Sequence, residues 1–446
     1  MNTDLAKEQA TISHEAIVVG KGGYAVNYGH LDISEPAGKN YFEYQHGNIP
    51  NQPGVVVKNI AICALAALED NPDQPGAKRL ASHATLINRG VIDIHFNKIY
   101  ALYKERKAKS DDPENTNNDT VRCYAMAAGT DSMLINEGTI NVYMDQDIDA
   151  QVSLYGCAIW ANARSFMQNR GKINIIGNGS WQSYIRGIGS MDSNLQVIND
   201  GEITVDLKRA YQTRILHTAG QYGSLLNNGI IRVKTGGRIM VLGSLAGTRM
   251  INNGTIEVVS LATFLENKVS YHYQFAPLAT AMYEHFLPND LPTCPTVNRG
   301  TINVHLLGTE ASGPNAVAFG FYCHQVGSKG ETPVHRMENE GIIEVTQEGP
   351  CHYHTAEVGV NMQSVGDYPV RVKIGTWKTK ARDFAQTHDL FICRSAKFDL
   401  SDMHLELIPS DGVSDAPIRP RDLVYQIETS KEAGETCEVH EANLDR

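Results

Sequence analysis

The chain lacks several patterns that would fix its class at once. Its 446 residues contain no hydrophobic run long enough to cross a membrane, so the sequence predicts no membrane span. Acidic residues outnumber basic ones by 50 to 39, and the net charge of −11 argues against a general binder of nucleic acid or membrane surfaces. The sequence also has no nucleophile elbow, phosphate-binding loop or HExxH helix, which excludes those routes to catalysis.

Closely spaced cysteines are missing as well. The eight cysteines are scattered without a CxxC pair, and this pattern suits reduced, mostly buried thiols in a cytosolic setting better than a disulfide scaffold. The first residues lack a basic start followed by an apolar stretch, so we expect no secretory signal in this sequence. The expectation is a cytoplasmic protein or export by a non-Sec route, and a secreted or cell-surface protein if a leader has been removed.

What the chain does contain is a repeat. Nine times an Asn is followed by Gly two residues later, by Ile or Leu four later, and by Val or Ile six later. Such a match should arise by chance on the order of 0.1 times in a chain of this length. The repeated asparagines are Asn27, Asn88, Asn136, Asn169, Asn199, Asn227, Asn252, Asn298 and Asn339.

The spacing of these asparagines predicts one coil of a parallel β-solenoid per repeat. The central steps are 33, 30, 28 and 25 residues, and the longer steps suit the same coil with an insertion. After each Gly, apolar residues alternate with mostly polar ones, which is the period of a strand with one buried face. The sequence therefore predicts an all-β fold, a single-stranded parallel β-helix (β-solenoid) of about 9–12 coils with several loop insertions.

The repeated residue types have structural explanations. Gly can adopt a positive φ, which we expect at the corner where the chain enters each strand. Asn tolerates left-handed geometry, and its amide can bond the nearby backbone. Stacked coil upon coil, the nine Asn side chains would bond one another in a buried, structural ladder.

Departures from the repeat mark the organisation of the chain. We expect an N-terminal lead-in over residues 1–15, the β-helix over 16–408, and a polar C-terminal tail over 409–446. Loops on a rigid scaffold often carry binding sites. The predicted insertions lie at about 35–80, 97–130, 260–296 and 306–336.

The repeated Asn-x-Gly-x-Ile-x-Val, over about residues 16–350, resembles the coils of right-handed parallel β-helices of the pectin-lyase-like class and of bacterial autotransporter passengers. The resemblance implies a right-handed helix. It selects no activity, because this coil carries adhesins, toxins, phage spikes and polysaccharide-cleaving enzymes, and a fold does not fix a function.

A stack of aromatic and basic residues is the main candidate for a binding site. A second strand between the repeats offers Trp160, Tyr184, Arg186, Arg214 and His217 on consecutive coils, with Arg164 and Trp181 nearby in sequence. If these side chains share a face, they would suit sugar rings or acidic saccharides. The alternative is mixed core and surface packing.

Acidic and metal-binding candidates are less complete. Asp111 and Asp112 form a tight pair in a low-complexity loop, and we expect the outward acids Asp32, Asp93, Glu257 and Glu344 to be surface residues several coils apart. Cysteines and histidines one coil apart could bind zinc, although strand alternation would point neighbours to opposite faces. These residues are Cys323, His324, Cys351, His352 and His354. The sequence assigns no catalytic residue, and we expect no metal or cofactor.

The leading hypothesis is a non-enzymatic β-helix scaffold that presents loops for recognition of a surface, a glycan or a protein partner, adhesin-like or associated with virulence. One alternative is a polysaccharide lyase or glycoside hydrolase on the same fold. Another is a structural assembly subunit whose solenoid ends stack into oligomers. Nucleic acid is not an expected partner.

Overall fold

The chain folds as a right-handed parallel β-helix, which confirms the fold class that the repeat predicts. Every regular element among the described residues of this computed structural model is a β-strand. No helix in that part of the chain is long and apolar enough to cross a membrane. The structure describes residues 16–33, 41–46, 57–72, 78–95, 120–144, 153–190, 192–218, 220–245, 247–261, 279–286, 294–307, 317–325, 334–348, 354–360, 370–380, 382–383, 389–393, 396–408, 422–423, 427–429 and 437–440.

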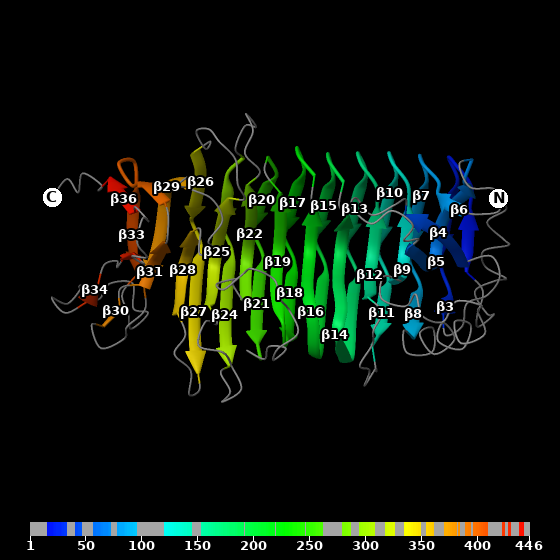
Figure 1. Ribbon diagram of the computed structural model, residues 1–446, viewed down its shortest axis with the longest axis horizontal. Coiled ribbons are helices and arrows are strands. Elements are labelled where there is room, and N and C mark those ends of the chain that lie inside the picture. The colour runs from blue at the N-terminus through cyan, green and yellow to red at the C-terminus, as the bar shows by residue number, and fades with distance from the viewer. Residues whose placement is uncertain are drawn as a thin grey trace. The chain divides into compact units, whose positions relative to one another are not determined.

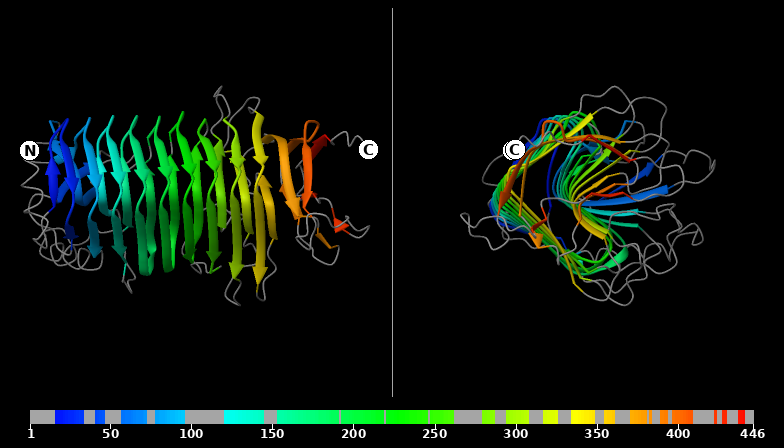
Figure 2. Two further views of the ribbon diagram at one scale, coloured as in Figure 1. Left: turned by 180° about the vertical axis from the view of Figure 1, so that it is seen from behind. Right: turned by 90° about the vertical axis from the view of Figure 1, so that its left-hand side faces the viewer.

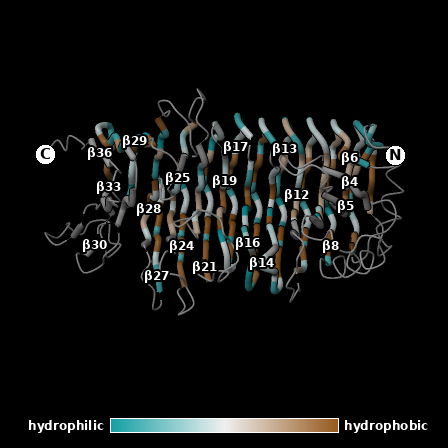
Figure 3. Tube along the Cα trace, viewed as in Figure 1, coloured by the Kyte–Doolittle hydropathy of each residue, from teal (hydrophilic) through white to brown (hydrophobic). Residues whose placement is uncertain are grey.

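The strands belong to two compact units. Unit 1 comprises residues 1–219 and 232–237, and unit 2 comprises residues 220–231 and 238–446. Within each unit, strands of consecutive coils lie parallel and side by side (Figure 1). Apolar and polar residues alternate along many of these strands (Figure 3), so that one side of each strand fills the core.

Each coil of unit 1 contributes strands to three faces, which the blue-to-green ribbons of Figure 2 show end on. Face I follows the Asn-x-Gly corner and contains β3 (His30–Ile33), β8 (Val91–His95), β11 (Thr139–Tyr143) and the first halves of β14 (Lys172–Ser190) and β16 (Glu202–Thr218). Face II contains β1 (Ile17–Val19), β5 (Val57–Asp70), β9 (Thr120–Ala128), β12 (Ser153–Ala161) and the second halves of β14 and β16. Face III leads into the Asn and contains β2 (Tyr24–Asn27), β7 (Thr85–Asn88), β10 (Met133–Asn136), β13 (Phe166–Asn169) and β15 (Gln196–Asn199).

Unit 2 repeats the three faces. Its face I contains β21 (Thr255–Ser260), β24 (Thr301–Leu307) and β27 (Ile342–Glu348). β18 (Ile230–Thr235) is divided, with residues 230–231 in unit 2 and 232–235 in unit 1. Its face II contains β19 (Arg238–Leu245), β22 (Ala279–Phe286), β25 (Val317–Gln325), β28 (His354–Val360), β31 (Asp389–Cys393) and β35 (Ile427–Thr429). Its face III contains β17 (Ser224–Asn227), β20 (Arg249–Asn252), β23 (Thr296–Asn298), β26 (Val334–Asn339), β29 (Val370–Lys380), β32 (Ala396–Asp399), β33 (His404–Ile408) and β36 (Cys437–His440).

Strands of the coil also lie inside the predicted insertions. β5 and β9 fall within 35–80 and 97–130, and β22 and β25 fall within 260–296 and 306–336. The first insertion additionally supplies β4 (Tyr41–His46) and β6 (Lys78–Leu80), which pair antiparallel with β5. Pairing also continues beyond residue 408, because β35 and β36 extend faces II and III and β30 (Arg382–Asp383) pairs antiparallel with β34 (Asp422–Leu423). The predicted lead-in, residues 1–15, lies outside the described residues.

The structure corrects the role expected for the repeat glycines. None of them is among the glycines with positive φ in the described chain. Instead, a Cβ at Gly138 would lie 2.0 Å from the carbonyl oxygen of Gly90 in the preceding coil, and the same approach of 1.9–2.1 Å recurs at the other stacked repeat glycines. Gly is therefore required at this corner because adjacent backbones touch there.

Left-handed backbone lies at another corner, five residues before the ladder Asn. Non-glycine residues there have φ between 56° and 60°, although such a conformation is costly for most side chains. The positions are Gly22, His83, Asp131, Arg164 and Asn194 in unit 1, and Tyr222 and Gly247 in unit 2. This turn sends each coil from face II into face III.

Candidate functional site

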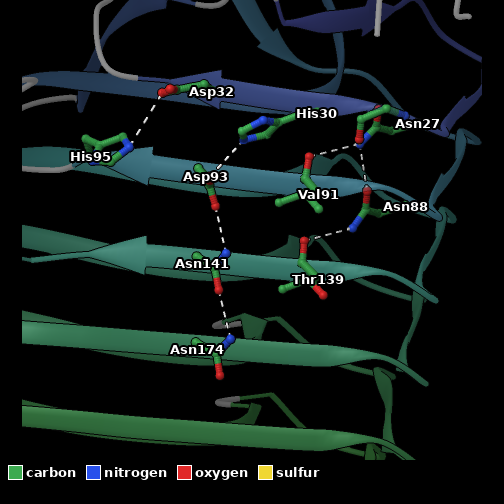
Figure 4. Close-up of polar contacts among 11 residues, drawn as sticks. Asn27, His30, Asp32, Asn88, Val91, Asp93, His95, Thr139, Asn141 and Asn174 are labelled. Carbon is green, nitrogen blue, oxygen red and sulfur yellow. Dashed lines mark hydrogen bonds and ion pairs between the residues drawn. The ribbon is translucent and has the colours of Figure 1, made fainter. Parts of the chain in front are cut away.

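The repeated asparagines form hydrogen-bonded ladders inside the corners. In unit 1, the Nδ2 of each Asn donates to the Oδ1 of the Asn in the next coil at 2.8 Å, from Asn27 through Asn88, Asn136 and Asn169 to Asn199. Figure 4 shows the first of these bonds, from Asn27 to Asn88. In unit 2, Asn227, Asn252, Asn298 and Asn339 do the same at 2.7–2.8 Å. All nine side chains are buried. Their amides bond each other and the neighbouring backbone, so the ladders are part of the scaffold.

A cluster of acidic and histidine side chains lies on face I of unit 1. Asp32 and Asp93 are in register on adjacent coils, which corrects the expectation that these acids lie several coils apart. His30 Nε2 lies 2.7 Å from Asp93 Oδ2, and His95 Nε2 lies 3.6 Å from Asp32 Oδ1 (Figure 4). Asn141 donates to the other oxygen of Asp93 at 2.7 Å.

Both oxygens of Asp93 therefore have partners, and the bond from Asn141 is continued by a 2.8 Å bond from Asn174 to Asn141. This second ladder stabilises the outer surface of face I. In unit 2, one coil lies between Glu257 and Glu344, because Asn303 of that coil is in register with both of them. Asp111 and Asp112 lie outside the described residues.

The predicted aromatic and basic residues lie together on face II of unit 1. They come from three neighbouring strands, β12, β14 and β16. Cys157, Arg186 and Arg214 are in register across these strands, and His217 is in register with Gly189. Tyr184 lies two residues before Arg186, so strand alternation places both side chains on the same side.

Direct contacts join these side chains. The guanidinium carbon of Arg186 lies 5.2 Å from the centre of the Trp160 ring, a cation–π arrangement. Arg214 Nη1 donates to His217 Nε2. The rings of Tyr184 and Tyr211 lie 4.8 Å apart. Trp160 Nε1 donates to Asn162 at 3.2 Å, which fixes the orientation of the indole.

Burial separates the cluster into two layers. Trp160, Arg186 and His217 are buried, with 8%, 7% and 3% of their surface exposed. Tyr184 and Arg214 are half-buried and remain partly accessible. The buried His217 accepts a hydrogen bond from the partly exposed Arg214, and the face as a whole is largely desolvated.

The arginines of this face act on the pKa of two neighbouring groups, His217 and Cys157. Burial, with the nearby guanidinium groups of Arg214 and Arg186, holds the pKa of His217 well below its usual range, so its imidazole is neutral and can accept the bond from Arg214. Burial raises the pKa of Cys157 to about 11, and Arg186 and Arg122 act in the opposite direction. Arg186 thus acts on the pKa of both His217 and Cys157.

Sequence reasoning missed three members of this face. Arg122 and Tyr124 come from β9, one coil before Trp160, and the Tyr124 ring lies 5.7 Å from that of Trp160. Tyr211 contacts Tyr184 because the register between β14 and β16 shifts after Ser180. The position of β9, one coil before β12, is a signal that could have pointed to Arg122 and Tyr124, whereas the shift leaves no sequence pattern.

The other candidates lie elsewhere. Arg164 binds Asp131 through two hydrogen bonds of 2.8 and 2.7 Å at the left-handed corner, and Trp181 is half-buried. Cys323 is buried in β25, the side chains of His324 and His354 lie outside the described part of their strands, and Cys351 and His352 lie outside the described residues. Among the described side chains, no group of three or more His, Cys, Asp or Glu could hold a metal ion.

The fold and this face define the class of the protein, a parallel β-helix with an arginine-rich aromatic face. Comparison of the chain with protein-family models, curated protein sequences and solved structures gave no match.

Proposed function

We propose that the protein is a non-enzymatic β-helix that recognises an acidic saccharide through face II of unit 1. The supporting observation is the register of Arg186 with Arg214 on adjacent coils. Two guanidinium groups on adjacent coils could both donate charge-assisted hydrogen bonds to one anionic group.

The neighbouring aromatic residues favour a saccharide over a small anion. Tyr184 and Tyr211 form a half-buried pair beside the arginines, and aromatic faces suit the apolar face of a sugar ring. Guanidinium groups suit carboxylate or sulfate groups because they donate in a planar fork. Trp160 lies behind Arg186 and holds its guanidinium in place.

Calorimetric titration with acidic and neutral oligosaccharides tests this function. We expect binding of the acidic ligands only, and we expect Arg214→Gln to weaken it roughly 10- to 100-fold, because a hydrogen bond to a charged group contributes about 1.5–3 kcal/mol. Arg170→Gln is the matched control, since Arg170 is an exposed arginine at the Asn corner of the same unit. Equal affinity for neutral ligands, or equal weakening by both substitutions, would contradict the proposal.

A glycoside hydrolase is the second candidate, because Asp32 and Asp93 are in register on adjacent coils. Carboxylates on neighbouring coils could act as acid and nucleophile. The two hydrogen bonds to Asp93 argue against this role. Release of reducing ends from a polysaccharide, abolished by Asp32→Asn, would favour the hydrolase over the non-enzymatic function.

A further inference from the structure

The core of unit 2 contains a buried carboxyl and a buried imidazole in direct contact. Glu284 of β22 and His335 of β26 are fully buried, and Glu284 Oε2 lies 3.0 Å from His335 Nε2. Thr296 of β23 lies between them, with its Oγ1 3.2 Å from Glu284 Oε2 and 3.3 Å from His335 Nε2. Proposed ligand binding in unit 1 does not use these residues.

The strands around Glu284 provide little compensation for a charge. Glu284 is in register with Ser244 of β19 and Cys323 of β25, both buried. Glu284 Oε1 has no hydrogen-bond partner in the structure. Cys294, which is partly exposed, and Arg249 are the other charged or titratable groups near this pair. Burial and the charge of Glu284 raise the pKa of Cys294, and Arg249 lowers it. A lone buried charge is costly under these conditions.

One titratable proton shared by Glu284 and His335 leaves the buried pair without net charge. With one proton between them, the pair is either a neutral carboxylic acid and a neutral imidazole or a compensated ion pair, and both states satisfy the 3.0 Å contact. Adding a second proton leaves an imidazolium beside a neutral carboxyl, and removing the proton leaves a carboxylate beside a neutral imidazole. Each of these states places a net charge on the buried pair.

We propose that Glu284 and His335 act as a one-proton switch that makes unit 2 most stable in weakly acidic solution and loosens it as the pH rises above neutrality. The switch lies in the core of the β-helix and would change the stability of unit 2 with the pH of the solution. Its physical basis is the difference in bound protons between the folded and unfolded chain.

The pKa directions agree with this geometry. Burial raises the pKa of Glu284 well above its usual value of 4.5, against the opposing effect of its bond with Thr296. Burial lowers the pKa of His335 from 6.5 to about 3. The raised Glu284 pKa contributes stability that is lost as the pH rises, and the depressed His335 pKa contributes stability that is lost as the pH falls.

The pH limits follow from counting protons. Between pH 4.5 and 6.5 the unfolded chain holds one proton, on the histidine, and the folded pair also holds one, so stability is level. Above pH 6.5 the unfolded histidine loses its proton and the folded pair keeps one, so the unfolding equilibrium constant rises about tenfold per pH unit. Below pH 4.5 the unfolded glutamate gains a proton and stability falls again.

Hydrogen exchange of the full-length protein tests the switch. Protection factors, corrected for the intrinsic effect of pH on exchange, are measured by mass spectrometry for peptides covering β22, β23 and β26. We expect protection in the wild type to be level from pH 5 to 6.5 and to fall about tenfold per pH unit above it. Peptides covering β10 and β13 of unit 1 serve as the internal reference.

Two conservative variants should differ in the pH at which protection begins to fall. Glu284→Gln removes the carboxyl, so protection should no longer fall above pH 6.5. His335→Gln leaves Glu284 alone, so the fall should begin near pH 4.5 instead. If one variant does not fold, the onset in the other still tests the proposal.

Other titrating groups do not give this pattern. Burial is the largest cause that raises the pKa of Cys294 and Cys323 above 9.0, and it is common to all three proteins, so both thiols stay protonated up to pH 8.5 with or without the smaller effect of Glu284. Wild-type protection that is level from pH 6.5 to 8.5, or a fall that is the same in Glu284→Gln, would overturn the proposal.

Discussion

At the scale of single residues, the ladder asparagines explain why the repeat is so regular. Each ladder bond lies in a buried corner, and Asn136 also donates to the carbonyl oxygens of Gly138 and Lys172 at 3.3 and 3.2 Å. Buried amides lose free energy when a partner is removed. A position with this many bonds admits few residues other than Asn.

Asn136→Ala should therefore destabilise unit 1 strongly. The substitution removes the acceptor of Asn88 and the donor to Asn169, and leaving buried partners unsatisfied costs about 2–4 kcal/mol in free energy of unfolding. Urea unfolding measures the loss.

Asn141→Ala is the control, because Asn141 belongs to the half-buried ladder on the outer surface of face I. It should cost less than about 1 kcal/mol. Equal losses for the two variants would show that burial of the ladder does not matter.

At the scale of the element, the corner after each Asn depends on close contact between backbones. Thr139 N donates to Gly90 O at 2.9 Å, and the missing Cβ of Gly138 would lie 2.0 Å from that same oxygen. The glycine thus allows the strand of one coil to bond the coil beside it.

Gly138→Ala should break this bond. Because the obstructing atom is backbone, the coil must separate locally, and we expect a loss of about 3 kcal/mol or more in urea unfolding. Gly20→Ala is the control, since nothing lies within 4 Å of its added Cβ, and its effect should stay within about 0.5 kcal/mol. Similar effects of both substitutions would contradict the contact.

Periodicity predicted the strands and the parallel fold because each repeat carries its own strand signal, as in β11 with its buried Ile140 and Val142. It did not predict the left-handed corner, because residues as different as His83, Arg164 and Tyr222 occupy it. Backbone bonds between coils determine that turn, as in His83 N to Thr130 O at 3.0 Å.

The candidate face was only partly predictable for a related reason. Coil spacing placed Trp160, Arg186 and Arg214 on neighbouring strands, but the contact of Tyr211 with Tyr184 depends on a register shift. The burial of Trp160 and Arg186 was also not evident, since it depends on packing between segments that are distant in sequence.

At the scale of the whole molecule, the repeat and the proposed binding function involve different residues. The chain is acidic, with a net charge of −11, yet face II of unit 1 combines Arg122, Arg186 and Arg214. Under the proposed function, this local group of arginines within an acidic chain favours recognition of a specific anion over general attraction to anionic polymers. The scaffold would position this face, and the arginines would select the ligand.

The most direct test of this division is the dissociation constant for an acidic oligosaccharide, measured by calorimetry for the wild type, Asn136→Ala and Arg214→Gln at a temperature where all three are folded. We expect the Asn136 variant to bind like the wild type, because the ladder only supports the scaffold, and the Arg214 variant to bind roughly 10- to 100-fold more weakly. An unchanged dissociation constant for Arg214→Gln, with weaker binding by Asn136→Ala, would contradict the account.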